Sequence, residues 1–185
     1  MKKSYFFTIA IAVAFIFSIG SAQASDMNNS DFESGDIGGW STWCVTGDVA
    51  SGINHTPGGN YSASPSLNDA NGPYDIGGLV QDISVNGGEE VKVSAWIKTD
   101  SLVGATGGEV QAILKFEFWG NGLLIGAEEA EGLMGTTDWT HASLSCSVPS
   151  DADTAKVILL LWNPEGLGNS GNVYFDDVEL TINGQ

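Results

Sequence analysis

The chain has 185 residues and carries six basic residues, all of them lysines, against 23 acidic ones. Two of the lysines and none of the acids lie in residues 1–24, so residues 25–185 set four lysines against all 23 acids. Binding to nucleic acid or to an anionic membrane surface needs clustered lysine or arginine, and the composition excludes both. It favours a partner that is neutral, cationic or held through a metal ion.

Residues 1–24 have the order of a secretory signal peptide. Lys2 and Lys3 precede an apolar run at residues 5–19, and Ala22-Gln23-Ala24 has the small-residue pattern of a cleavage site. The apolar run is shorter than a full membrane span, which disfavours a membrane anchor. We expect a protein exported to the extracellular space or a periplasm, with residues 25–185 as one mature domain and no membrane attachment after cleavage.

Cys44 and Cys146 are the only two cysteines of the chain. In an oxidising compartment such a pair can form a disulfide. The bond would close a loop of about 100 residues, for which the chain-entropy model gives a stabilisation of roughly 4–5 kcal/mol. Two buried free thiols are the alternative.

Apolar and polar residues alternate with a period of two along most of the chain, as in half-buried strands. The pattern predicts strands at residues 79–85, 91–97, 110–118, 140–148 and 174–182, and residues 156–162 are apolar on both faces, as in a central strand. Only residues 128–132 are a candidate for a short helical turn. Glycine-rich connections separate the segments, and the whole predicts an all-β fold, a two-sheet antiparallel jelly-roll β-sandwich.

The motifs for catalysis are weak. Gly166 to Gly171 matches G-x-G-x-x-G, but a strand follows it where nucleotide binding needs a helix. The two histidines have no zinc-ligand spacing. Glu117 is the best single candidate for an acid of glycoside hydrolysis, although the nearby Lys115 favours a solvated surface charge, and no second acid is marked as its partner. We therefore expect no enzymatic activity.

Three groups of motifs resemble a known family. They are NNSDFESG at residues 28–35 with Trp40 and Trp43; QDI at 81–83, VSAWIK at 93–98 and DWT at 138–140; and YFDDVEL at 174–180. Their order and spacing resemble the carbohydrate-binding modules of the galactose-binding-like β-sandwich group, including families four, sixteen and twenty-two, with family sixteen most similar. The likeness spans residues 28–182.

The resemblance implies a binding site with two tryptophans across a cleft and glutamines near them. Trp43 and Trp162 match the tryptophans, and Gln81 matches one glutamine. Lys115 falls about where another glutamine is expected, and it completes the predicted ligand-binding set together with Gln111. Ile158 also departs from the pattern, because a polar residue is expected there. A pyranose ring can stack its apolar face on an indole while its hydroxyls bond to polar side chains.

Several of these residues have a structural alternative. By alternation Gln81 shares a face with Leu79 and Ile83, so it can also be a buried amide with its hydrogen bonds satisfied. Trp40, Trp96 and Trp139 are interpreted as structural. Trp119 is either a contact at the rim of the site or an exposed turn residue.

The resemblance also implies a structural calcium ion that ties the first and last strands together. Glu33 matches the acid of the N-terminal motif, and Asp176 matches the acid of the C-terminal motif. Carbonyl groups of residues 58–60 are candidates for further ligands of a cation that takes 6–8 oxygens. The alternative is that Glu33 is an ordinary surface acid and that Asp176 caps backbone amides.

The function predicted is that of a secreted, monomeric, non-catalytic module that binds a neutral polysaccharide or oligosaccharide of the β-glucan or mannan type. One alternative is an extracellular matrix or adhesion module that binds protein or a cell surface. A second alternative is a small polysaccharide-degrading enzyme that uses Glu117.

Overall fold

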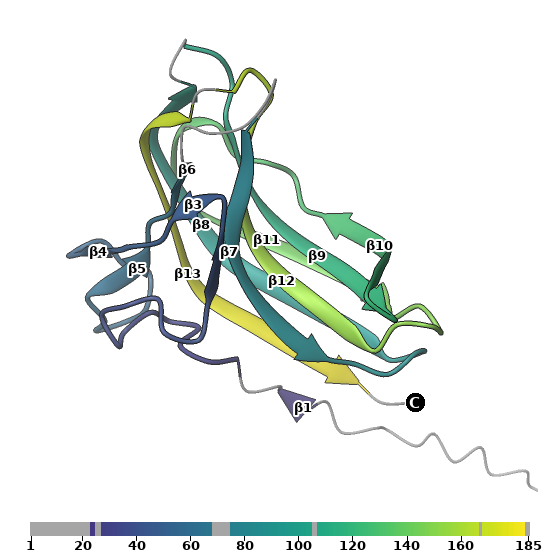
Figure 1. Cartoon of the computed structure of the whole chain (residues 1–185). Helices are drawn as coiled ribbons and strands as arrows, with labels where there is room; N and C mark the ends of the chain where they lie inside the picture. Colours follow the sequence, from purple (N-terminus) through teal and green to yellow (C-terminus); the bar gives the residue numbers. More distant parts are fainter. Residues whose placement is uncertain (1–22, 25–26, 68–74, 105–106, 167, 184–185) are drawn as a thin grey trace, which may run out of the picture.

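The computed structural model describes residues 23–24, 27–67, 75–104, 107–166 and 168–183. Within them the chain is all-β, and all strand pairs are antiparallel. Two sheets face each other as a sandwich, which confirms the predicted fold class (Figure 1). In the part of the chain that is described, no helix has the length and apolarity to cross a membrane. Residues 1–22 of the predicted signal peptide lie outside the described residues.

The first sheet, called the β8 sheet here, has the strand order β11-β8-β13-β5-β4, and β1 pairs with β13. Its strands are β1 (Gln23–Ala24), β4 (Val49–Ser51), β5 (Tyr61–Ala63), β8 (Glu90–Gly104), β11 (Gly135–Ser147) and β13 (Asn169–Asn183).

The second sheet, called the β12 sheet, has the order β10-β9-β12-β7-β2. Its strands are β2 (Ser41–Trp43), β7 (Asp75–Ser84), β9 (Gln111–Gly120), β10 (Leu123–Glu129) and β12 (Thr154–Asn163). A small ribbon of β3 (Val45–Thr46) and β6 (Ser66–Leu67) stands beside the two sheets. The expected helical turn at residues 128–132 is wrong, because residues up to Glu129 continue β10 in its pairing with β9.

The core lies between the two sheets, where the predicted alternation places it. Along β9 the buried row is Ala112, Leu114, Phe116 and Phe118, and along β8 it is Val91, Val93, Ala95 and Ile97. These rows pack in one cluster with residues of β7, β12 and β13. Strand β12 is central, between β9 and β7, as its apolar sequence predicts.

Strand β12 is also apolar on the face that points away from the core. Ile158 and Leu160 form a second small cluster there with Ile113, against which Val80 and Trp162 pack. The outer face of the β12 sheet therefore has an apolar floor, and that floor carries the site described below.

The predicted disulfide is absent: Cys44 and Cys146 are free thiols. Cys44 follows β2, which is the last strand at one edge of the β12 sheet, whereas Cys146 lies in β11, which pairs with β8 at the opposite side of the sandwich. A disulfide needs its two Cα atoms within about 7 Å. Cys146 packs against the core, where burial and the charges of Glu128 and Glu90 raise the pKa of its thiol.

Candidate functional site

Strand pairing places a set of residues in rows across the outer face of the β12 sheet. Opposite residues of antiparallel strands share a face. One row runs from Ser41 on β2 through Val80 and Ile158 to Lys115. The next runs from Asp82 through Lys156 to Glu117. Polar and apolar groups from four strands thus come together on one surface.

Trp43 stands at the β2 end of this surface. It pairs with Gly78 of β7, and its side chain is 41% exposed. A Cβ atom at the neighbouring Gly77 would lie 2.5 Å from the carbonyl oxygen of Trp43. Only a residue without a side chain allows β2 to come so close to β7, so this glycine determines where Trp43 stands.

A groove of about 490 Å³ crosses the face. Its lining residues are Ser41, Thr42, Trp43, Val80, Asp82, Glu117, Trp119, Lys156 and Ile158. Val80 and Ile158 contribute the apolar floor, and two tryptophans, Trp43 and Trp119, belong to the lining. An apolar floor with a few polar groups is typical of a small-molecule site.

The charged groups of the groove are joined in pairs. The Lys156 ammonium lies 2.8 Å from the Asp82 carboxylate. The Lys115 ammonium lies 3.3 Å from Glu117 and 3.0 Å from Glu129 on β10. Lys156 therefore lines the groove and Lys115 lies beside it, and each of these two lysines is paired with an acidic side chain.

Lys115 keeps its proton at ordinary pH. Burial would lower the pKa of its ammonium group, but the hydrogen bond and charge of Glu129, with those of Glu117, raise the pKa above the usual lysine value. Lys115 is thus a permanent hydrogen-bond donor beside the groove.

The structure brings four of the five predicted ligand-binding residues to this face. Trp43 lines the groove and Lys115 lies beside Glu117. Trp162 and Gln111 pair with each other farther along the sheet, and Trp162 packs on the floor cluster. Gln81 is not with them: it is 5% exposed, pairs with the core residue Val157, and exchanges two hydrogen bonds of 2.8 and 3.0 Å with the backbone of Asn28.

The sequence-based site set did not include Trp119, Asp82 or Lys156. A signal for Trp119 was present, because alternation along residues 111–119 places it on the same face as Lys115 and Glu117. Asp82 and Lys156 could not be recognised from the sequence, because no residue pattern within β7 or β12 shows that these two strands are neighbours.

Glu33 and Asp176, the predicted calcium ligands, accept hydrogen bonds from backbone amides. The Glu33 carboxylate accepts from the amides of Asn60 and Tyr61 at 2.8–2.9 Å. Asp176 is fully buried and accepts from the amides of His55, Thr56 and Asp177. Its burial raises the pKa of the carboxyl group, which the three amide hydrogen bonds partly offset.

As they are arranged, Glu33 and Asp176 do not by themselves form a set of calcium ligands. Amide N–H groups point at the carboxylate oxygens that would have to face a cation, and calcium takes 6–8 oxygen ligands. Among the described residues no three histidine, cysteine or acidic side chains gather in a group that could hold a metal. Calcium binding stays a prediction.

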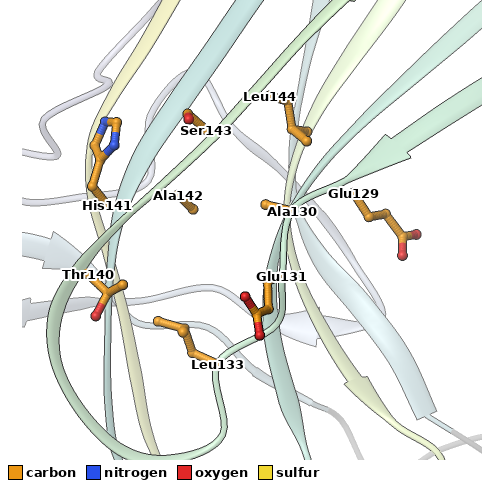
Figure 2. A pocket seen from close by; sticks show the side chains of 9 residues that line it. All are labelled: Glu129, Ala130, Glu131, Leu133, Thr140, His141, Ala142, Ser143 and Leu144. Atoms are coloured by element: carbon orange, nitrogen blue, oxygen red, sulfur yellow. The ribbon is translucent and has the colours of Figure 1, made fainter.

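A second hollow, of about 350 Å³, lies at the open side of the sandwich between β11 and the segment that follows β10. Its lining includes Ala130, Leu133, Ala142 and Leu144 with Glu129 and Glu131. Figure 2 shows the ring of His141 on the far side of β11 from Leu133. Among the described residues, its lining holds no tryptophan, tyrosine or phenylalanine, the side chains on which a sugar ring would stack.

The fold is shared with solved structures of different activities. The xylan-binding domain CBM22-1 of Xyn10C from Paenibacillus barcinonensis is 15% identical, with a TM-score of 0.59 over 90% of this chain and 97% of that chain. A Stig cyclase, Fisc, from Fischerella sp. TAU is 18% identical, with a TM-score of 0.60 over 88% and 98%. At such identities these structures show the fold alone.

The chain also resembles one part of a longer enzyme, the enzymatically active domain of tailspike protein 4 from bacteriophage CBA120. The identity is 13% and the TM-score 0.61, over 84% of this chain but only 21% of that chain. Among curated proteins no relative is found. The model of one family, described as a carbohydrate binding domain, matches residues 26–166. That match covers most of the chain, and the protein belongs to this family of carbohydrate-binding domains.

Proposed function

We propose that the protein is a secreted, non-catalytic carbohydrate-binding module that holds a neutral polysaccharide in the groove of the β12 sheet. The observation that carries the proposal is the exposed indole of Trp43 at an apolar floor, next to ion-paired lysines and carboxylates. Sugar rings would stack on Trp43 and Trp162, and their hydroxyl groups would bond to the paired charges. Export follows from the signal-peptide pattern of residues 1–24.

Stacking and hydrogen bonding have complementary roles in this proposal. The apolar face of a pyranose ring buries its C–H groups against an indole, which is driven by desolvation of both surfaces. The hydroxyl groups at the ring edge then need donors and acceptors in the plane of the ring. Lys156 with Asp82, and Lys115 with Glu117, supply both kinds of partner.

The charge of the molecule supports a neutral ligand. Residues 25–185 hold 23 acids against four lysines, so an acidic polysaccharide would meet long-range repulsion. Inside the groove the charges are paired, which suits an uncharged ligand. A protein of similar fold, the Paenibacillus domain, is named as binding xylan.

A polysaccharide-degrading enzyme is the second candidate, and one observation favours it. Asp82 and Glu117 stand on one row of the groove with Lys156 between them. Two strand spacings separate their Cα atoms by about 10 Å, which is compatible with a pair of carboxylates that act on either side of a sugar. However, lysine ammonium groups hold both carboxylates, and Glu117 is only 9% exposed. We therefore favour binding without catalysis.

The test is binding to β-glucan, mannan and xylan by affinity electrophoresis and calorimetry, with a reducing-sugar assay on the same samples. Trp43→Ala and Trp162→Ala are expected to weaken binding at least tenfold, which is about 1.4 kcal/mol each, because the stacking surface is lost. Trp139→Ala on the outer face of the β8 sheet is the matched control and should bind as the native protein does.

Three results would contradict the proposal. Native affinity in both Trp43→Ala and Trp162→Ala would remove the site. Release of reducing ends that Glu117→Gln abolishes would establish the enzyme. Self-association or cell attachment without affinity for any of the three glycans would favour the adhesion alternative.

A further inference from the structure

The groove has a second aromatic residue in its lining, Trp119, which the sequence left either as a contact at the rim of the site or as an exposed turn residue. We propose that Trp119 is an additional stacking platform, so that the groove holds an internal run of several sugars rather than one ring or a chain end. The inference rests on the proposed function and concerns the class of ligand that the same site selects.

Strand register separates the two tryptophans widely. From β2 to β9 there are three strand spacings, or roughly 14 Å. Along the strands, Trp43 pairs with Gly78, whereas Trp119 pairs with Thr154 and through it with Ser84, six residues farther along β7. Six residues of strand span about 20 Å. A single pyranose ring cannot touch both indoles, but both line one continuous groove.

The indole of Trp119 is held in place before any ligand arrives. Its Nε1 donates a hydrogen bond of 2.9 Å to the Glu117 carboxylate. The Lys156 ammonium lies 5.5 Å from the ring centroid, within the range of a cation–π contact. The carbonyl oxygen of Trp119 accepts a hydrogen bond of 3.0 Å from the amide of Asp153. A side chain that is already ordered loses little entropy when a ligand stacks on it.

These contacts distinguish a platform from an exposed turn residue. Trp119 is the last but one residue of β9, directly before the turn to β10, where a free indole would be expected to move. Instead it is half-buried, and the two side chains that hold its indole, Glu117 and Lys156, both line the groove. The same two groups, Glu117 and Lys156, therefore orient Trp119 and stand between it and Trp43.

The arrangement suits an unbranched neutral chain that lies diagonally across the strands. One ring would rest near Trp43, another on Trp119, and the hydroxyl groups of the rings between them would face Asp82, Lys156 and Glu117. Binding strength should then depend on chain length, because a short oligosaccharide reaches only one platform. A side branch in the middle of the run would meet the floor or the ion pairs.

The experiment is isothermal titration calorimetry with unbranched β-1,4-linked gluco-, manno- and xylo-oligosaccharides of two, four and six sugars. Native protein, Trp43→Ala, Trp119→Ala and Trp119→Phe are compared. Leu123→Ala is the matched control, because Leu123 is 70% exposed on the far side of the same turn but does not line the groove. Circular dichroism and melting curves confirm that each variant is folded.

For the native protein we expect the affinity to rise at least tenfold between the shortest and the longest oligosaccharide. In Trp119→Ala that rise should shrink to about threefold or less, while Trp119→Phe, which keeps a flat ring, should retain most of it. Leu123→Ala should follow the native length profile.

The outcomes separate the two proposals. If Trp43→Ala loses affinity and Trp119→Ala keeps the native length profile, the platform is overturned and the proposed function stands. If the native protein binds none of the oligosaccharides or their parent polysaccharides, the proposed function itself fails. A length profile that is flat in the native protein also overturns the platform.

Discussion

Gln81 holds the N-terminal segment against the β12 sheet. Its side-chain oxygen accepts from the amide of Asn28, and its side-chain nitrogen donates to the carbonyl of the same residue. The amide side chain is thus a two-way clamp between positions 53 residues apart. The resemblance of the motifs implied that Gln81 contacts the ligand, whereas the alternation of apolar and polar residues placed it among core residues. Its position in the structure agrees with the alternation.

Replacing this clamp should affect stability and leave ligand binding unchanged. Gln81→Leu leaves the amide and carbonyl of Asn28 without their side-chain partners, and we expect the free energy of unfolding to fall by about 1–3 kcal/mol. Urea denaturation measures the loss, and calorimetry with a polysaccharide measures the affinity. Gln111→Leu, on the outer face of the β12 sheet, is the comparison. It should weaken the binding of the polysaccharide and leave the free energy of unfolding unchanged. Weaker binding at full stability in Gln81→Leu would show that Gln81 touches the ligand.

At the scale of strands, β10 forms its backbone hydrogen bonds with β9 alone in the described part of the chain. Almost every residue of β10 is exposed, and it forms one edge of the β12 sheet. Besides the backbone ladder, Lys115 of β9 reaches Glu129 at the end of β10 while also contacting Glu117 beside it. Lys115 therefore connects the edge strand to the groove.

The contribution of Lys115 to the stability of the folded protein should decrease only as the pH becomes alkaline. The pKa of Lys115 is raised in the folded protein, so its stabilisation is complete below the unfolded value, near 10.5, and is lost as pH rises through the higher folded value. We expect the difference in melting temperature between native protein and Lys115→Met to stay constant from pH 7 to 9 and to shrink in more alkaline solution.

The exposed Lys92 of β8 supplies the control for that measurement, as Lys92→Met. A melting difference for Lys115→Met that already declines between pH 7 and 9 would mean that the ion pairs with Glu117 and Glu129 do not hold in solution.

At the scale of the molecule, one loop joins the beginning of the domain to its last strand. A β-bulge interrupts the pairing of β13 with β8 after Asp176, and Asp177 there has a φ of 46°. The bulge lets both aspartates contact the loop between β4 and β5. Asp176 accepts hydrogen bonds from the backbone amides of His55 and Thr56, and the Asp177 carboxylate lies 2.6 Å from the His55 ring nitrogen. The Glu33 carboxylate accepts hydrogen bonds from the backbone amides of Asn60 and Tyr61 at the end of the same loop.

Calcium at Glu33 and Asp176, if it binds, has to displace some of these amides. A calcium ion bound there would stabilise the folded state, so EDTA would lower the melting temperature by several degrees and added calcium would restore it. Glu33→Gln should remove the response. Differential scanning calorimetry with and without EDTA, with magnesium as the control cation, measures it. An unchanged melting temperature would mean that the amide hydrogen bonds hold the loop without a metal.

The fold class and much of the groove face were within reach of the sequence, because alternation is local. A period of two along residues 110–118 is enough to put Phe116 in the core and Lys115 outside it, and the apolar residues 156–162 are enough to make β12 central. The same rule places Gln81 in the core, against the resemblance. Each of these outcomes follows from the geometry of a single strand.

Only the tertiary structure decided which strands are neighbours and which stand at an edge. That choice separates Cys44 from Cys146 on opposite sides of the sandwich and leaves both thiols free. It brings Asp82, Lys156 and Glu117 into one row, and it extends the groove from Trp43 to Trp119. Pairing between distant strands depends on the packing of the whole core, so no local pattern of residues specifies it.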